Sequence, residues 1–351
     1  MFTEVNGAEA ILHYGDWRAE HSALRTSAVV LDLSSRSRLC LLGADRAKFL
    51  HGQVTNDVNA LQNGHGCYAA LVTAKGRMQS DLRIWNLAEE LLLDFEPGLT
   101  AAVTARLEKY IVSDDVQVID VSPHYGLLSV QGPKAAEVVA QLGLGGELPV
   151  QELRFASANN AALGQLYLMN QSRAGTTGFD VFVPIASLAV VAGKLIAAAK
   201  SFGGRASGWQ ALEVARIESG IPRFAVDMDE TTLPPEAGIE ARAMSYRKGC
   251  YIGQEVLNRL HTMGHVNREL RGLRLAADLS DVPSRGDKLF KDGKEVGHVT
   301  SAVFSPALSA NIALGYVRRE WLAVGTELTL ETKNGSSRAV VAELPFVKAA
   351  V

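Results

Sequence analysis

The 351-residue chain has few cysteines, no long apolar run and nearly balanced charges. Its three cysteines, Cys40, Cys67 and Cys250, are widely spaced, which gives no support to a disulfide framework or a thiolate metal cage. That usage fits a reducing compartment. The N-terminus has no basic start followed by an apolar core, and no segment is long enough to span a bilayer. We therefore predict a cytoplasmic protein without a membrane anchor.

The chain also lacks an excess of positive charge. Its formal net charge of −3 creates no global field for a phosphate backbone, so general nucleic-acid binding has little support. Hydrophobic residues make up 47% and charged residues 21%, which is ordinary for a soluble globular protein and far from disorder. The length suffices for two or three domains.

Two similar sets of strand and helix patterns occupy the first two thirds of the chain. In the first set, a strand at 36–43 and a short helix at 44–53 precede an antiparallel meander of three strands near 68–73, 81–87 and 91–95. A helix after Pro97 and a strand at 116–121 complete it. The second set begins at Tyr125 and ends with an alanine-rich helix near Lys200. Such alternation favours an α+β fold of ferredoxin-like units over a doubly wound parallel sheet.

From Leu270 onward the pattern changes to short strands separated by turns, with Asp292-Gly293 as a hairpin signal. An all-β terminal domain is therefore expected. We place the boundary near residues 266–271, with an α+β region at 1–266 and a β domain at 267–351.

The most distinctive string is RKGCYIGQEVLNR, which holds Cys250 between a glycine and a tyrosine. Arg247, Lys248 and the start of a helix after the turn at 253–255 would all favour a reactive thiolate. The alternative is a buried structural cysteine, because free cysteine commonly behaves as a small hydrophobe.

The octapeptide KGCYIGQE resembles the signature of the YgfZ family of folate-binding proteins, which support iron-sulfur proteins. Its signature residues are Lys248, Gly249, Cys250, Tyr251, Gly253, Gln254 and Glu255. The strings FLHGQVTNDVNAL and AKGRM are similar to the same family. In contrast, HYGDWRAEHSALRTSAVVLDLS and VGHVTSAVFSPALSANIALGYV resemble the T-proteins, the aminomethyltransferases of glycine cleavage. The likeness covers nearly the whole chain.

This resemblance implies three domains arranged in a ring, with ferredoxin-like units and a C-terminal antiparallel β-barrel. It also implies that the ligand is tetrahydrofolate or one of its one-carbon-substituted forms. In the T-proteins a tyrosine and two adjacent aspartates form part of the folate site, and their equivalents are Tyr68, Ser80 and Asp81. The carboxylate of Asp81 would orient or deprotonate an amine. The alternative is that Asp81 merely starts a strand.

Two further folate contacts follow from the T-protein likeness. Asp180, in SRAGTTGFDVFV, would accept two parallel N–H bonds from the pterin, unless it is an outward strand residue. Arg216, in LEVARIESGIPRF, would anchor a folate carboxylate or the pterin oxygen. It could instead pair with Glu213, three residues earlier on the same helix.

His261 and His265 are four residues apart, as two metal ligands on one helix face would be. Gly264 argues against a helix there, and spacing indicates no third ligand, so we predict no metal site.

Three functions compete. The preferred one is a folate-dependent factor for assembly or repair of iron-sulfur proteins, with Cys250 and Asp81 as its reactive groups. Three isolated cysteines cannot hold a cluster alone, so client or assembly proteins would be partners. The second is an aminomethyltransferase, disfavoured by Cys250, by Ser80 and by a missing acidic insertion before Phe179. The third is a non-catalytic folate-binding scaffold. The default oligomeric state is a monomer.

Overall fold

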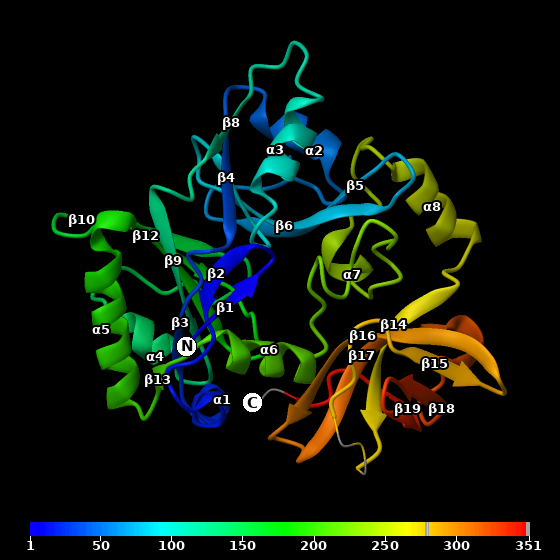
Figure 1. The fold of residues 1–351 in the computed structure, drawn as a ribbon. Helices are drawn as coiled ribbons and strands as arrows, with labels where there is room; N and C mark the ends of the chain where they lie inside the picture. The colour runs from blue at the N-terminus through cyan, green and yellow to red at the C-terminus, as the bar shows by residue number, and fades with distance from the viewer. Residues whose placement is uncertain (278, 280, 349–351) are drawn as a thin grey trace.

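In the computed structural model, residues 1–277, 279 and 281–348 are described. They form three lobes around a centre, as Figure 1 shows: two sheet-and-helix lobes and a barrel. The predicted α+β fold with a C-terminal antiparallel barrel is confirmed.

The first lobe is a five-stranded sheet in the order β5-β6-β7-β4-β8. Its strands are β4 (Ser37–Leu42), β5 (Gly66–Val72), β6 (Met78–Asn86), β7 (Leu91–Phe95) and β8 (Gln117–Asp120), and its helices are α2 (Arg46–Gln53) and α3 (Thr100–Glu108). The predicted meander is confirmed, because β5, β6 and β7 pair in sequence and run antiparallel. Leu39 and Leu41 on β4 pack with Val103 and Leu107 on α3, so one face of the sheet is an apolar core.

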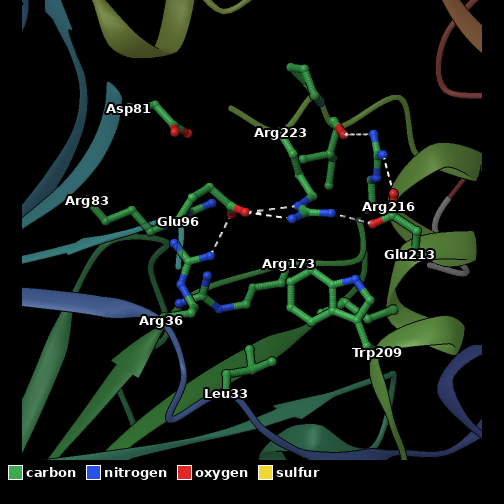
Figure 2. A pocket seen from close by; sticks show the side chains of 13 residues that line it. Leu33, Arg36, Asp81, Arg83, Glu96, Arg173, Trp209, Glu213, Arg216 and Arg223 are labelled. Atoms are coloured by element: carbon green, nitrogen blue, oxygen red, sulfur yellow. Dashed lines mark hydrogen bonds and ion pairs between the residues drawn. The ribbon is translucent and has the colours of Figure 1, made fainter. Parts of the chain in front are cut away.

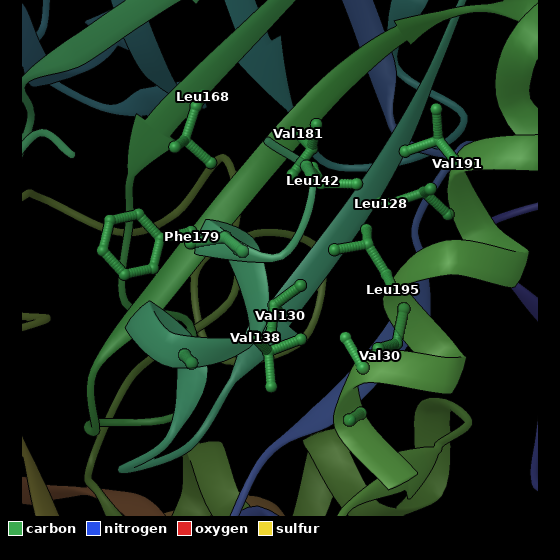
Figure 3. Packing of buried hydrophobic residues seen from close by; sticks show 14 of the residues in the cluster. Val30, Leu128, Val130, Val138, Leu142, Leu168, Phe179, Val181, Val191 and Leu195 are labelled. Atoms are coloured by element: carbon green, nitrogen blue, oxygen red, sulfur yellow. The ribbon is translucent and has the colours of Figure 1, made fainter. Parts of the chain in front are cut away.

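The second lobe is a six-stranded sheet in the order β10-β11-β12-β9-β3-β13. Its strands are β3 (Val29–Asp32), β9 (Tyr125–Gln131), β10 (Phe155–Asn160), β11 (Gly164–Asn170), β12 (Gly178–Pro184) and β13 (Arg205–Ala206); α4 (Ala135–Ala140), η1 (Ile185–Ser187) and α5 (Leu188–Ser201) accompany it. Figure 3 shows Val191 and Leu195 of α5 against Val30, Leu128 and Val130 of the sheet.

The N-terminal segment completes this second sheet. β3 pairs with β9, nearly a hundred residues later, and β13 adds a short parallel edge. The sequence patterns did not predict β3, β10 or β13. The first lobe lies between β3 and β9 in the sequence, so the two lobes are interleaved along the chain.

Three helices and one hairpin connect the lobes. They are the hairpin of β1 (Phe2–Val5) and β2 (Ala8–Ile11), with α1 (Trp17–Thr26), α6 (Trp209–Glu218) and α7 (Glu240–Ala243). Glu218 at the end of α6 accepts hydrogen bonds from His21 at 2.9 Å and Ser305 at 2.5 Å, all buried. These bonds join α1, α6 and the barrel.

The third lobe is a closed barrel in the order β14-β17-β16-β15-β18-β19. It contains β14 (Arg268–Leu275), β15 (Lys288–Lys291), β16 (Lys294–Ser305), β17 (Ala310–Arg318), η2 (Arg319–Trp321), β18 (Glu327–Thr332) and β19 (Gly335–Ala342). The predicted hairpin is confirmed: Asp292 and Gly293 join β15 to β16 with φ of 50° and 73°, the positive values that suit a tight hairpin turn. Because the barrel begins at Arg268, we propose residues 267–351 as a separate domain. Among the described residues, no helix is both long and apolar enough to cross a membrane.

Candidate functional site

A small charged cavity of about 40 Å³, partly open to solvent, lies where the two sheets meet α6. Figure 2 shows that guanidinium and carboxylate groups converge on it from both lobes. Its lining residues are Leu33, Arg36, Asp81, Arg83, Glu96, Arg173, Trp209, Leu212, Glu213, Arg216, Ile221, Pro222 and Arg223.

Most of these charges are paired, beginning with Arg36 just before β4. Its Nε donates to Asp94 and its Nη1 to Glu96, each at 2.7 Å. Asp94 and Glu96 lie two apart on and after β7, so they share a side of the strand. Burial would raise the pKa of Glu96, but the charges of Arg223 and Arg36 outweigh it and lower this pKa to about 2.

Two further arginines bind this acidic pair. Arg173, in the loop before β12, donates to Asp94 at 2.8 Å and to both carboxylate oxygens of Asp180. Arg223, after α6, donates to Glu96 at 2.8 Å, and its guanidinium carbon lies 4.5 Å from the centroid of the Trp209 ring. The three arginines therefore hold two lobes and the connecting helix together around the cavity.

Asp81 is the least satisfied acid of the cavity. Its Oδ2 accepts a hydrogen bond from the Tyr68 hydroxyl at 2.9 Å, while its Oδ1 is buried and has no partner among the described residues. Burial first, and then the negative charge of Glu96, raise the pKa of Asp81 above its usual value. A carboxylate with a free oxygen and a raised pKa is suited to accept a proton from a ligand.

Arg83 complements Asp81 on the same strand. It lies opposite Tyr68 in the β5–β6 register, and it has no ion-pair partner among the residues that the structure describes. Burial first, and then the charges of Arg173 and Arg36, lower the pKa of Arg83. The cavity thus presents one free carboxylate oxygen and one free guanidinium, two strand positions apart, and Trp209 and Leu33 add apolar surface to its lining (Figure 2).

The sequence-predicted folate residues do not all reach the cavity. Asp81 and Arg216 line it, while Tyr68 is outside the lining and donates a hydrogen bond to Asp81. Asp180 is 1% exposed and its carboxylate is taken up by Arg173, so Arg173 rather than Asp180 faces the cavity. Ser80 points to the opposite face of β6, because neighbouring residues of a strand alternate sides. The presence of serine at position 80, where the T-proteins have aspartate, therefore leaves the lining of the cavity unchanged.

Both terminal nitrogens of Arg216 donate to protein partners, whereas its buried Nε has no partner among the described residues. Its Nη1 donates to Asp227 at 2.5 Å, and its Nη2 donates to Ser301 at 2.7 Å and to Glu213. The alternative that Arg216 pairs with Glu213 on the same helix is therefore correct, and Asp227 is its second, buried partner.

The octapeptide residues Lys248 and Gly253 contact the backbone of the first lobe. The Lys248 ammonium donates to the backbone carbonyls of His51, in the last turn of α2, and of Val54 and Asn56, just after it, at 2.5–2.8 Å. Gly253 has φ of 87°, and a Cβ there would lie 2.5 Å from the Thr73 carbonyl oxygen in the β5–β6 turn. Glycine is therefore required at this close contact.

The remaining octapeptide residues occupy different environments. Tyr251 is buried in the apolar cluster beneath β5, and Gln254 and Glu255 start helix α8 (Gln254–Met263), with Glu255 in its first turn. Cys250 is exposed, so the alternative of a buried structural thiol does not hold. It does not line the central cavity, and no hydrogen bond or ion pair links Lys248 to it among the described residues.

His261 and His265 are not brought together by a continuous helix, because α8 ends at Met263. The Nδ1 atom of His261 donates a hydrogen bond to Glu240 Oε1 at 3.0 Å, and the His261 ring stacks on the Tyr246 ring with centroids 3.8 Å apart. Among the described residues, no group of three potential ligands could hold a metal ion.

Sequence reasoning missed most of the charged residues of the cavity. Two signals were available: acids at alternate positions in the apolar run LLLDFE, and arginines at alternate positions in RSRLCLL. Charges inside apolar strand patterns are rarely tolerated unless they are paired.

We expect the Glu96 network to make stability depend on acid pH. Since the folded pKa of Glu96 is depressed from 4.5 to about 2, its contribution is complete above pH 4.5 and is lost as pH falls toward 2. That contribution is on the order of 3 kcal/mol. Urea unfolding at pH 7, 4 and 3 should show Glu96→Gln less stable at pH 7 and less sensitive to acid. Glu327→Gln, an exposed control, should follow the wild-type curve.

Comparisons with known proteins agree with this architecture. Residues 1–248 match the GCVT N-terminal domain, and residues 268–348 match the glycine cleavage T-protein C-terminal barrel domain. The chain therefore belongs to the glycine cleavage T-protein family.

Relatives and a solved structure extend over almost the full length. The chain is 29% identical to an aminomethyltransferase of Shouchella clausii, over 98% of this chain and 93% of that protein. It is 26% identical to the aminomethyltransferase of Bacillus subtilis, over 98% and 94% respectively. The crystal structure of glycine cleavage system aminomethyltransferase T from Bartonella henselae superposes with a TM-score of 0.89 at 26% identity, covering 99% of this chain and 94% of that one.

Proposed function

We propose that the protein is a tetrahydrofolate-dependent aminomethyltransferase. The observation that carries this proposal is the free, buried Oδ1 of Asp81 in the central cavity, on a chain whose full-length relatives are named aminomethyltransferase. The comparisons thus favour the second of the sequence-based hypotheses over the iron-sulfur hypothesis, which came first. The substitution of Ser80 no longer counts against it, since Ser80 faces away from the cavity.

The chemical groups of the lining complement those of a reduced pterin. Asp81 offers an acceptor for ring N–H groups, and Arg83 offers donors for a ring carbonyl or a glutamate carboxylate. Trp209, Leu33 and Leu212 supply apolar surface for a flat ring. Such a mixture of apolar walls and a few convergent polar groups is typical of small-molecule sites.

In the proposed reaction, one folate amine attacks the aminomethyl carbon carried on a lipoyl sulfur, and the bond from this carbon to its amino group breaks as ammonia leaves. The second folate amine then attacks the same carbon and displaces the lipoyl thiol, which gives methylenetetrahydrofolate. Asp81 Oδ1 would orient the attacking amine and accept the proton that it loses on forming the new carbon–nitrogen bond. Arg83, the guanidinium of the lining that has no ion-pair partner among the described residues, would position the folate.

The test uses the wild-type protein, tetrahydrofolate and an aminomethylated lipoyl carrier protein. We expect saturable folate binding by calorimetry and ammonia release that requires both substrates. Folate binding without ammonia release would leave a folate scaffold as the better description, and absence of folate binding would reject the proposal.

A second candidate function is support of iron-sulfur proteins in the manner of the YgfZ family. The observation that favours it is the exposure of Cys250 within KGCYIGQE, outside the central cavity. An exposed thiol can reach a client protein, and any cluster would need ligands from that client because Cys40 and Cys67 are buried.

Cys250→Ser separates the two functions. We expect this variant to keep folate affinity and ammonia release within about twofold of wild type, because the thiol lies outside the cavity lining. In cells that lack the protein, activity of an iron-sulfur enzyme is then the measurement that decides. Restoration by wild type but not by Cys250→Ser would establish the second function, and equal restoration would remove Cys250 from it.

A further inference from the structure

A second cavity, of about 190 Å³, lies between the two sheets and shares no lining residue with the central one. It is bordered by β4 and β7 of the first lobe and by β9, β11 and β12 of the second. Its lining residues are Arg38, Cys40, Leu87, Glu90, Leu92, Val121, His124, Tyr125, Tyr167 and Phe182.

Arg38 is the unusual member of this lining. Its side chain is fully buried, and its Nη2 donates to the backbone carbonyls of Ser34, Ser122 and Tyr125 at 2.7–3.2 Å. Its Nε and Nη1 are also buried, yet they meet no acceptor among the described residues. No carboxylate of the described chain forms an ion pair with it.

Arg36 and Arg38 differ in their carboxylate partners. Arg36 and Arg38 are two residues apart, and Arg36 faces the central cavity with two carboxylate partners. Arg38 faces the second cavity with none. A buried cation is normally paired, because removing it from water is expensive unless an anion compensates. Burial accordingly lowers the pKa of Arg38 to about 10.

The other lining residues determine which shape and charge of anion this cavity can accept. Leu87, Leu92, Val121 and Phe182 are apolar, and the rings of Tyr125 and Tyr167 lie with centroids 6.2 Å apart. Such walls suit a flat apolar body. The carboxylate of Glu90 adds a negative charge to the lining; burial first, and then this charge, raise the pKa of the Cys40 thiol. It would repel a second charge on a ligand, which disfavours phosphate and dicarboxylates.

We propose that this cavity binds a small monocarboxylate with a flat apolar body, whose carboxylate accepts hydrogen bonds from Nε and Nη1 of Arg38. Exposed His124 lies at its rim, so the cavity has access to solvent at that side. A water molecule could accept single hydrogen bonds there, but it would not neutralise the guanidinium. This site is independent of the proposed folate chemistry, because none of its residues lines the central cavity.

The experiment titrates benzoate into the full-length protein and follows binding by calorimetry. We expect saturable binding that weakens about tenfold to a hundredfold when benzamide, which is uncharged and of similar size, replaces benzoate. Arg38→Met should weaken benzoate binding to a similar extent. Leu87→Trp, which fills a half-buried part of the lining without touching the charge, should abolish it.

Arg83→Met is the matched control, because it removes the free guanidinium of the central cavity instead. We expect it to leave benzoate affinity within twofold. A crystal soaked with 4-bromobenzoate should place the bromine between the two sheets and the carboxylate on Arg38. The proposal is overturned if benzoate does not bind, if benzamide binds equally well, or if binding is lost in Arg83→Met and kept in Leu87→Trp.

Discussion

Asp81→Asn is expected to lower the rate of ammonia release by roughly a hundredfold to ten thousandfold, the usual contribution of a positioned general base. Asparagine can still accept the Tyr68 hydrogen bond, but its amide cannot take a proton from the attacking amine. Steady-state assays with tetrahydrofolate and the aminomethylated carrier protein measure the effect. Folate affinity should change far less than the turnover number, because the loss falls on the reacting step.

The same variant should fold as well as wild type or slightly better. Folding raises the pKa of Asp81, so the native state binds more protons, and this carboxylate reduces stability as pH rises through the unfolded value of 3.8 and above. The neutral amide of the Asp81→Asn variant does not titrate, so this loss of stability disappears. An inactive variant with an undiminished midpoint of urea unfolding would confirm a chemical role, whereas loss of activity together with loss of stability would point to a structural one.

Tyr68→Phe provides the positioning control. The Tyr68 hydroxyl donates to Asp81 and so holds the pKa of that carboxyl down. Its removal should move the acid limb of the pH profile of turnover to higher pH while leaving the maximal rate within about tenfold. An unchanged limb would mean that Asp81 does not set the pH dependence.

Much of the fold followed from local pattern. The meander at β5–β7 was predictable because turn residues bound each of its strands. The barrel was predictable because short strands of alternating pattern follow one another there, with Asp292-Gly293 as a hairpin turn. β3 was not predictable from its own sequence, since its partner β9 lies nearly a hundred residues away. Local pattern carries no information about a pairing of that range.

The residues of the site were harder to predict from the sequence than the fold. Asp81 could be found by resemblance, but Glu96 and Arg173 acquire their meaning only when the two lobes meet and Arg36 bridges them. For Asp180 the resemblance suggested a contact with the ligand, but in the folded protein this carboxylate forms an ion pair with Arg173. Sequence identifies which charges are unusual, whereas the packed structure decides which of them remain free for a ligand.

Arg216→Met is expected to lower the free energy of unfolding by about 3–5 kcal/mol, because it leaves Asp227 buried without its counter-ion. Asp227 is 2% exposed and also accepts hydrogen bonds from Thr300 and Ser301 of the barrel at 2.5 and 2.7 Å. The arginine therefore ties α6 to the third lobe. Urea unfolding at pH 7 measures the loss, and Arg338→Met, which breaks an exposed pair, should change stability by no more than about 1 kcal/mol.

The double variant Arg216→Met/Asp227→Asn distinguishes a structural from a ligand-binding role. An amide at 227 can still accept from Thr300 and Ser301 but carries no charge, so the double variant should recover at least half of the stability lost in the single one. Folate affinity should follow stability in both. If Arg216→Met instead weakened folate binding tenfold without lowering the unfolding free energy, Arg216 would be a ligand anchor and the Asp227 pair dispensable.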